Sequence, residues 1–255
     1  MNTLVLLEQI DRVAVLTLNR PERHNSLVPA LLSELLDGLT TIQALTDVRA
    51  VLLQANGKSF STGGDVRAFY DNLDDLEAYA NRVVSLLNQV ILAMFDLPVP
   101  IVAAVHGIVT GGSIGLVLAS DVVLVAPEAS FTPYYSVVGF SPDGGWSALL
   151  PAVIGPKRAA AIIMLNQTIS AKNAVDWGLA NRIAARDEIG NEAMQSSQAL
   201  SGMCSQSISR TKRLLRPAYG DIAARLEAER HQFVQQVVTE EAQQGMRRFL
   251  GIKKY

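Results

Sequence analysis

Two glycine clusters and a carboxylate mark residues 105–146 as the part of the chain best suited to chemistry. The stretch opens with VHGIVTGGSIG and closes with GFSPDGGW, which carries Asp143. Glycine lets a backbone approach a ligand closely and present unpaired N–H groups, because no Cβ stands in the way. A carboxylate beside such donors suggests proton chemistry. The alternative is a turn aspartate that binds nearby amides, and for an isolated PDGG segment this alternative is favoured.

Other motifs for catalysis or metal binding are weaker. GGSIG matches the G-x-S-x-G turn that exposes a serine nucleophile, here Ser113. The histidine of a triad would have to be His231, which lies in the charged run EAERHQF, typical of a solvated helix face. A P-loop is excluded because Ser113 stands where a lysine would bind phosphate. Three scattered histidines and one cysteine predict no zinc or other metal site.

The composition indicates a globular protein with a large core. The chain has 255 residues, 49% of them hydrophobic, and a net charge of -2, which predicts neither nucleic-acid nor membrane binding. Residues 97–120 carry no charge, but their prolines, glycines and polar residues favour a buried strand, turn and short helix over a membrane span. The single Cys204 and the absence of a signal-peptide pattern favour a cytoplasmic location.

Alternating strands and helices are expected to position the glycine clusters. Apolar runs and alternation predict strands, and helical spacing, prolines and caps predict helices; the strands are expected at 4–7, 13–19, 50–54, 100–105 and 122–126, and the helices at 29–42, 74–94, 113–119, 156–165 and 170–177. This order favours parallel strands joined by crossover helices. Beyond residue 187 the pattern is helical only, so we place a module boundary near residue 190.

Five sequence blocks in order resemble the crotonase, or enoyl-CoA hydratase/isomerase, family. They are LNRPERHNSL, KSFSTGGDVRAF, AAVHGIVTGGSIGLVLASDVVLVAPEASF, VGFSPDGGWSALLPAVIG and ISAKNAVDWGLANRI. The resemblance covers nearly the whole chain. It implies an α/β fold, with a ββα superhelical (spiral) core over residues 1–190 and a C-terminal helical trimerisation region over residues 191–255. It also implies an acyl-CoA substrate, no separate cofactor, and a homotrimer or dimer of trimers.

The resemblance assigns roles to both glycine clusters. The family polarises the thioester carbonyl with two backbone N–H groups, which here fall on Gly64 in STGGD and Gly112 in TGGSIG. Removal of an α-proton places negative charge on that oxygen, and each preorganised donor is worth about a hundredfold or more in rate. A carboxylate is still needed to take the proton.

The chain departs from the hydratase pattern, which has glutamates where Gly115 and Tyr135 stand here. Without both acids, efficient hydration is not expected. The dehalogenase branch has a similar SPDGG loop, but it carries a tryptophan at the position of Tyr135 and a histidine at that of Leu92. A single carboxylate can instead move a proton from the α to the γ carbon. We therefore predict an isomerase that converts 3-enoyl-CoA to 2-enoyl-CoA, with Asp143 as acid and base.

The resemblance also suggests where coenzyme A binds, and alternatives remain open. The predicted contacts lie near NRPERHNSL, at the turn 61–66, beside the glycine cluster and in the tail: Arg23, Ser61, Gly63, Asp65, Val66, Gly111, Tyr135, Phe249 and Lys253. Tyr135 is expected mainly as a pocket wall, and Asp65 also as a helix cap. The alternatives are an enoyl-CoA hydratase, epoxide isomerisation or dehalogenation, a non-catalytic acyl-CoA-binding protein, and a serine hydrolase using Ser113.

Overall fold

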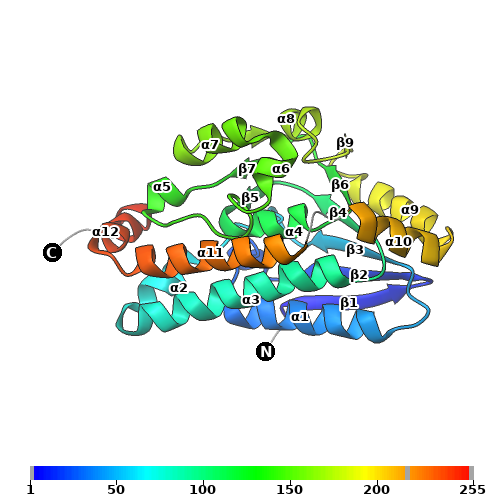
Figure 1. Ribbon diagram of the computed structural model, residues 1–255, viewed down its shortest axis with the longest axis horizontal. Coiled ribbons are helices and arrows are strands. Elements are labelled where there is room, and N and C mark those ends of the chain that lie inside the picture. The colour runs from blue at the N-terminus through cyan, green and yellow to red at the C-terminus, as the bar shows by residue number, and fades with distance from the viewer. Residues whose placement is uncertain (1–2, 216–218, 253–255) are drawn as a thin grey trace.

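The computed structural model describes residues 3–215 and 219–252, which form a mixed α/β fold around a six-stranded sheet (Figure 1). The strand order is β1-β2-β3-β4-β6-β9, with β1 and β2 antiparallel and the remaining neighbours parallel. The strands are β1 (Val5–Ile10), β2 (Val13–Leu18), β3 (Ala50–Ala55), β4 (Ile101–Val105), β6 (Val122–Val125) and β9 (Arg182–Ile183). The predicted parallel pairing is therefore confirmed.

Helices cover both faces of this sheet, so its central strands are apolar on both sides. On one face, Leu16 and Leu53 pack in a core shared with α1 (Pro29–Ala44) and α3 (Leu76–Asp96). On the other face, Val15 and Leu52 pack against α9 (Ile189–Ser201). Buried parallel strands read as continuous apolar runs for this reason.

A smaller sheet and the remaining helices complete the fold. The small sheet has the order β5-β7-β8, formed by β5 (Ile108–Thr110), β7 (Ser130–Thr132) and β8 (Ile169–Ser170). The remaining helices are η1 (Pro21–Arg23), α2 (Val66–Asp71), η2 (Leu73–Asp75), η3 (Gly111–Ser113), α4 (Ile114–Leu118), α5 (Tyr135–Val138), α6 (Leu150–Ile154), α7 (Pro156–Met164), α8 (Ala171–Asp176), α10 (Ser205–Leu215), α11 (Tyr219–Val237) and α12 (Glu240–Phe249).

Local signals in the sequence set several of these boundaries. Pro29 starts α1, where its missing N–H costs nothing. The side chains of Asp65 and Ser170 cap α2 and α8 by accepting from the N–H groups of Ala68 and Asn173.

The C-terminal helices pack onto the core. The proposed boundary near residue 190 falls inside α9, whose Ile189 is buried against the sheet. Helix α11 runs beside α3 (Figure 1), and the Asn88 side chain of α3 donates to the Leu226 carbonyl at 3.0 Å. The helices α9 and α11 therefore pack against the core, α9 against the sheet and α11 against α3.

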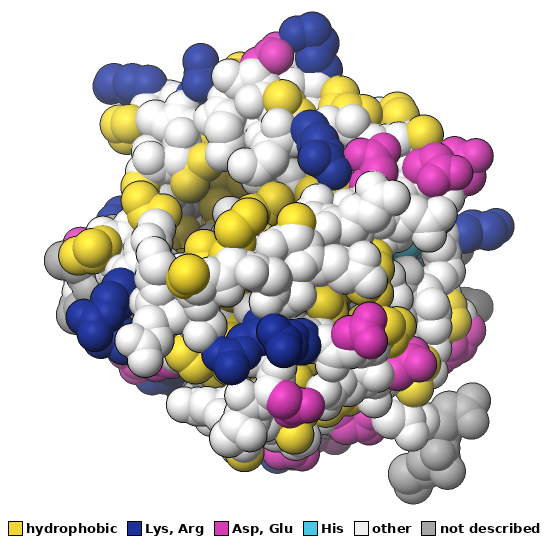
Figure 2. Space-filling model, turned by 90° about the vertical axis from the view of Figure 1, so that its right-hand side faces the viewer, with side chains coloured by type: hydrophobic (Ala, Val, Ile, Leu, Met, Phe, Trp, Pro, Cys, Tyr) yellow, Lys and Arg dark blue, Asp and Glu magenta, His cyan; other side chains and the backbone are white. Residues whose placement is uncertain are grey.

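The surface shows mixed charge on the face drawn in Figure 2. Lys and Arg side chains alternate there with Asp and Glu side chains, and a hollow in the upper left is lined by hydrophobic side chains. Within the part of the chain that the structure describes, no helix is both long and apolar enough to cross a membrane.

Candidate active site

Glycines bring the two predicted donor segments into direct contact. Gly63 has φ +68°, and a Cβ on it would lie 2.3 Å from the Thr110 carbonyl oxygen. Ser61 pairs with Val109 in an isolated β-bridge, and the Thr110 N–H donates to the Ser61 carbonyl at 3.2 Å. Only a residue without a side chain allows this approach. The N–H groups of both segments therefore reach the same space.

The two predicted oxyanion donors are available for a ligand. Gly112 lies in the first turn of η3, where N–H groups have no partner within the helix. The Gly64 N–H has no acceptor among residues 3–215 and 219–252. A Cβ placed on Gly111 would lie 4.0 Å from both the Gly64 nitrogen and the Tyr135 hydroxyl, which shows how closely these groups surround one point. This arrangement suits an oxygen that gains negative charge.

Asp143 lies beside Gly112, lines the same space and is only 6% exposed. Both of its carboxylate oxygens are 3.0 Å from the position that a Cβ on Gly112 would occupy. Burial raises its pKa to about 7, against a hydrogen bond from Tyr135 that lowers it, and the charge of Glu229 raises it further. A carboxyl group with this pKa can both take and return a proton near neutral pH.

Tyr135 is a hydrogen-bond donor to Asp143 as well as a wall of the site. Its hydroxyl lies 2.5 Å from Asp143 Oδ1 and 3.0 Å from the Asp143 backbone carbonyl oxygen. Burial, and then the nearby Asp143 charge, raise the pKa of Tyr135 well above 10. The phenol therefore stays protonated and engages one carboxylate oxygen, which leaves Oδ2 for other partners.

Position 115 has no room for a glutamate side chain in this structure. A Cβ on Gly115 would lie 2.4 Å from Ile91 Cδ1 and 2.7 Å from the Gly144 carbonyl oxygen. Gly144 itself has φ +63°, and a Cβ on it would lie 2.3 Å from the Gly112 carbonyl oxygen. The loop that carries Asp143 is therefore packed against the donor segment at backbone distance.

Gly64, Gly112, Tyr135 and Asp143 line a cleft of about 410 Å³. Phe69, Phe140 and Phe233 form a wall of the cleft, and their ring centroids lie 5.2–5.8 Å apart in tilted and edge-on pairs. Arg23 and Arg67 also line it. The cleft thus combines an apolar aromatic wall, suited to an acyl group, with cationic side chains.

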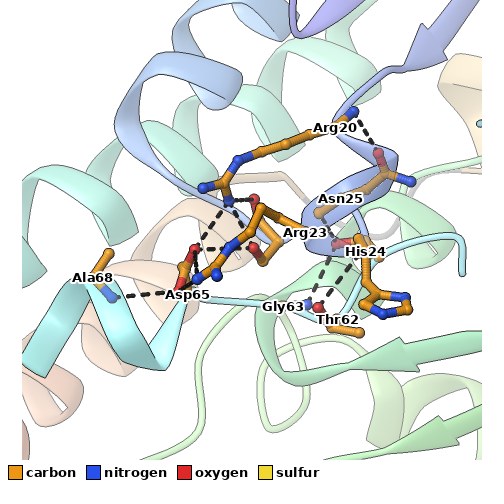
Figure 3. A network of polar contacts seen from close by, with 10 residues as sticks. Arg20, Arg23, His24, Asn25, Thr62, Gly63, Asp65 and Ala68 are labelled. Carbon is orange, nitrogen blue, oxygen red and sulfur yellow. Dashed lines mark hydrogen bonds and ion pairs between the residues drawn. The ribbon is translucent and has the colours of Figure 1, made fainter.

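A polar network beside the cleft fixes the segment that carries Arg23 (Figure 3). Asp65 accepts from Arg20 at 3.0 Å and from Arg23 at 3.1 Å, while also capping α2. Burial alone would raise the pKa of Asp65, but the hydrogen bonds from these arginines outweigh it and hold the pKa below its usual value. Asp65 is therefore a structural anion, which leaves Arg23, with a side chain 47% exposed, at the cleft.

The structure brings most of the predicted site residues together. Those that line the cleft are Arg23, Gly64, Asp65, Val66, Gly111, Gly112, Tyr135, Asp143 and Phe249. Ser61 does not line it, because its buried hydroxyl donates to the Asn25 carbonyl at 2.7 Å, and neither does Gly63. Lys253 lies outside the described residues.

Sequence reasoning missed several side chains around the site. The run EAERHQF is not entirely a solvated face, because Glu229 and Phe233 are buried while Glu227 and His231 are exposed. Arg67 was also missed. For Glu229 and Phe233 the available signal was helical spacing, because they are four residues apart on α11. For Arg67 it was the position in the first turn of α2, directly after the Asp65 cap.

The geometry argues against a serine hydrolase. Ser113 is fully buried, and its hydroxyl lies 2.7 Å from the Thr110 carbonyl oxygen and 3.0 Å from that of Ser61. His231 is exposed on α11, and among the described residues its ring is hydrogen-bonded only to Gln235. Within residues 3–215 and 219–252, no group of three or more His, Cys, Asp or Glu side chains is arranged to hold a metal ion.

Comparisons with known proteins show which family the chain belongs to. The sequence profile described as enoyl-CoA hydratase/isomerase matches residues 8–255. The chain is 30% identical to 1,2-epoxyphenylacetyl-CoA isomerase of Escherichia coli, over 76% of this chain and 75% of that protein. It is 31% identical to trans-2-decenoyl-[acyl-carrier-protein] isomerase of Streptococcus mutans, over 72% and 71%.

A solved structure shows the same fold. The crystal structure of enoyl-CoA hydratase from Bacillus halodurans superposes with a TM-score of 0.90 at 25% identity, covering 96% of this chain and 99% of that one. Isomerases and a hydratase thus stand among the relatives. The chain belongs to the enoyl-CoA hydratase/isomerase, or crotonase, family and is an enzyme that acts on acyl-CoA thioesters.

Proposed function

We propose that this enzyme moves a carbon–carbon double bond, converting a 3-enoyl-CoA to the conjugated 2-enoyl-CoA. The observation that carries the proposal is Asp143, a buried carboxylate with a pKa of about 7 beside the Gly112 donor. The two positions at which hydratases carry glutamates hold Gly115, which has no room for a side chain, and Tyr135, which is hydrogen-bonded to Asp143. One titratable group in this position supports the transfer of one proton.

The proposed reaction needs no group beyond those in the cleft. Asp143 takes a proton from C2 of the 3-enoyl thioester, and the electron pair moves toward the thioester oxygen. The N–H groups of Gly64 and Gly112 stabilise the resulting dienolate. The protonated Asp143 then delivers the proton to C4 as the double bond forms between C2 and C3. Water and a separate cofactor take no part, and the carboxylate returns to its starting state.

Coenzyme A would extend past the cationic side chains of the cleft. Arg23 and Arg67 are the described cations that line it, and both can meet phosphate oxygens. Phe249 of α12 lies edge-on to Tyr134 with ring centroids 6.1 Å apart, so the C-terminal helix closes part of the entrance. These features support the proposed contacts at Arg23 and Phe249.

We also propose a homotrimer or a dimer of trimers, assembled through the C-terminal helices. Two adjacent leucines of α10, Leu214 and Leu215, are 84% and 79% exposed in the single chain. Contiguous exposed apolar patches are typical of surfaces that a neighbouring subunit covers, and these two leucines would form part of such a patch.

A panel of enoyl thioesters tests the proposed reaction. With 3-enoyl-CoA substrates, the absorbance of the conjugated thioester should rise with time. With 2-enoyl-CoA substrates, the same absorbance should fall only slowly, because no second acid is present to activate water. Rapid loss of 2-enoyl-CoA without turnover of any 3-enoyl-CoA would establish a hydratase instead. Tight binding without any turnover would favour the non-catalytic alternative.

The pH dependence should report the Tyr135–Asp143 pair. Asp143 acts as the base only when ionised, so kcat/KM should rise with pH and level off above about pH 7. The Tyr135 hydrogen bond favours the ionised form, so Tyr135→Phe should raise the Asp143 pKa and move the acid limb to higher pH. The control is Tyr134→Phe, a cleft residue that packs on Phe249, which should leave the limb in place. A limb that moves in both variants, or in neither, would contradict this assignment.

A further inference from the structure

A second buried carboxylate, Glu229 of α11, binds the loop that carries Asp143. It is 5% exposed. Its Oε2 accepts from the Gly145 N–H at 2.8 Å, and its Oε1 accepts from the Ser147 N–H at 2.7 Å, the Ser147 hydroxyl at 2.7 Å and the Ala148 N–H at 2.8 Å. These four donors belong to three residues within five positions of Asp143. The loop is therefore held by one anion that comes from a distant part of the chain.

A second side chain of α11 also contacts the loop, but it donates a hydrogen bond where Glu229 accepts them. Arg225, one turn before Glu229, donates to the Ser147 carbonyl at 3.3 Å. On the other side of the loop, the Trp146 indole N–H donates to the Gly111 carbonyl at 2.8 Å. The loop is thus fixed between α11 and the glycine segment that presents Gly112, so a shift of α11 would move Asp143 relative to the oxyanion donors.

The charge of Glu229 adds an effect that a neutral support would lack. Amide and hydroxyl oxygens also accept from backbone N–H groups, so binding this loop does not in itself require a carboxylate. A negative charge near buried Asp143 disfavours a second negative charge and so raises the Asp143 pKa. The side chains of the described residues that act on Asp143 are Tyr135 from α5 and Glu229 from α11, and their effects are opposite. Arg225 is exposed and contacts the loop through Ser147.

We propose that Glu229 is a positioning residue for the reaction, which holds the Asp143 loop against the oxyanion donors and, through its charge, favours proton uptake by Asp143. The proposal rests on the proposed isomerase function for its kinetic consequence. It extends the machinery to α11, which lies outside the loops that carry the glycine clusters. The C-terminal helices then serve catalysis as well as covering the core.

The test compares Glu229→Gln with Glu227→Gln in the whole enzyme. Glu227 lies on the same helix but is exposed and pairs with Arg230, so the control removes a charge without touching the loop. In Glu229→Gln, one of the two accepting oxygens becomes an NH2 group that cannot accept, so amide hydrogen exchange over residues 143–150 should accelerate. The value of kcat should fall about 10- to 100-fold with KM within about threefold, because small misplacements of reacting groups cost this much. The acid limb of kcat/KM should move to lower pH. Glu227→Gln should show none of these changes.

Two further measurements keep the outcome decisive. Arg225→Ala retains the Glu229 charge and removes one loop contact, so it should accelerate exchange over residues 143–150 even if Glu229→Gln fails to fold. A carbon-13 NMR titration of labelled aspartates, with Asp143→Asn used to identify the signal, reads the Asp143 protonation in the resting enzyme. This reading holds even if no 3-enoyl-CoA is turned over, so the proposed function can fail separately. Unchanged exchange in the loop variants, or an Asp143 titration unaltered in Glu229→Gln, would overturn the proposal.

Discussion

Asp143→Asn should lower kcat for 3-enoyl-CoA isomerisation by about 10³-fold or more while leaving thioester affinity within about threefold. Positioned acid–base groups contribute about 10² to 10⁴ in rate, and here one group performs both proton transfers. Asparagine has nearly the same shape and can still accept the Tyr135 hydrogen bond through its carbonyl oxygen, but it cannot take up a proton. Steady-state kinetics with a 3-enoyl-CoA, together with calorimetric titration of a saturated acyl-CoA, measure both quantities.

The matched control for this loss is Glu22→Gln. Glu22 lines the same cleft but is exposed and lies in η1, so its charge should not enter the proton transfer. The control should keep kcat within about threefold of the unaltered enzyme. If Asp143→Asn retained normal turnover, the proton would have to travel through another group and the proposed mechanism would be wrong.

Gly115→Glu should destabilise the protein strongly and should not create a hydratase. The first side-chain atom alone would lie 2.4 Å from Ile91 of α3 and 2.7 Å from the Gly144 carbonyl oxygen. Overpacking of this kind costs about 1–3 kcal/mol, and burying an unpaired carboxylate against the loop that carries Asp143 adds to that cost. Chemical denaturation measures the free energy of unfolding, and loss of 2-enoyl-CoA absorbance measures hydration.

Gly190→Glu provides the comparison for this variant. Gly190 lies in α9, and nothing stands within 4 Å of the position that its Cβ would take. Glutamate favours helix over glycine, so this variant should be as stable as the unaltered enzyme or slightly more so. A stable Gly115→Glu enzyme that hydrates 2-enoyl-CoA efficiently would refute the view that packing around position 115 excludes hydratase chemistry.

Local sequence signals predicted the main strands and helices, but not the short strands β5, β7, β8 and β9 or the short helices α5 and α6. Caps at Asp65 and Ser170 and the proline at residue 29 act on their immediate neighbours, so their effect can be read without a tertiary structure. The glycine clusters implied close backbone approach. The roles of Gly64, Gly112 and Asp143 followed from the family resemblance, because an isolated PDGG segment favours a turn aspartate. The structure places all three along one cleft.

Groups that depend on packing between distant segments were not predictable. Glu229 is 84 residues from Gly145 and lies in a highly charged run, so only the packing of α11 shows that its carboxylate points inward. The aromatic wall likewise joins Phe69, Phe140 and Phe233 from three separate segments. Periodicity showed that α11 and α9 are helices, but it did not show which surfaces they cover.

The hydrogen bond from Tyr135 to one oxygen of Asp143 has a stereochemical consequence. With Oδ1 engaged at 2.5 Å, Oδ2 is the oxygen free to carry the transferred proton, and it serves both carbon atoms from one side of the bound chain. Departure and return should then occur on the same face of the planar dienolate. The structure thereby predicts a suprafacial shift, in which the prochiral hydrogen lost from C2 and the face protonated at C4 are fixed by the side of the cleft on which Asp143 stands.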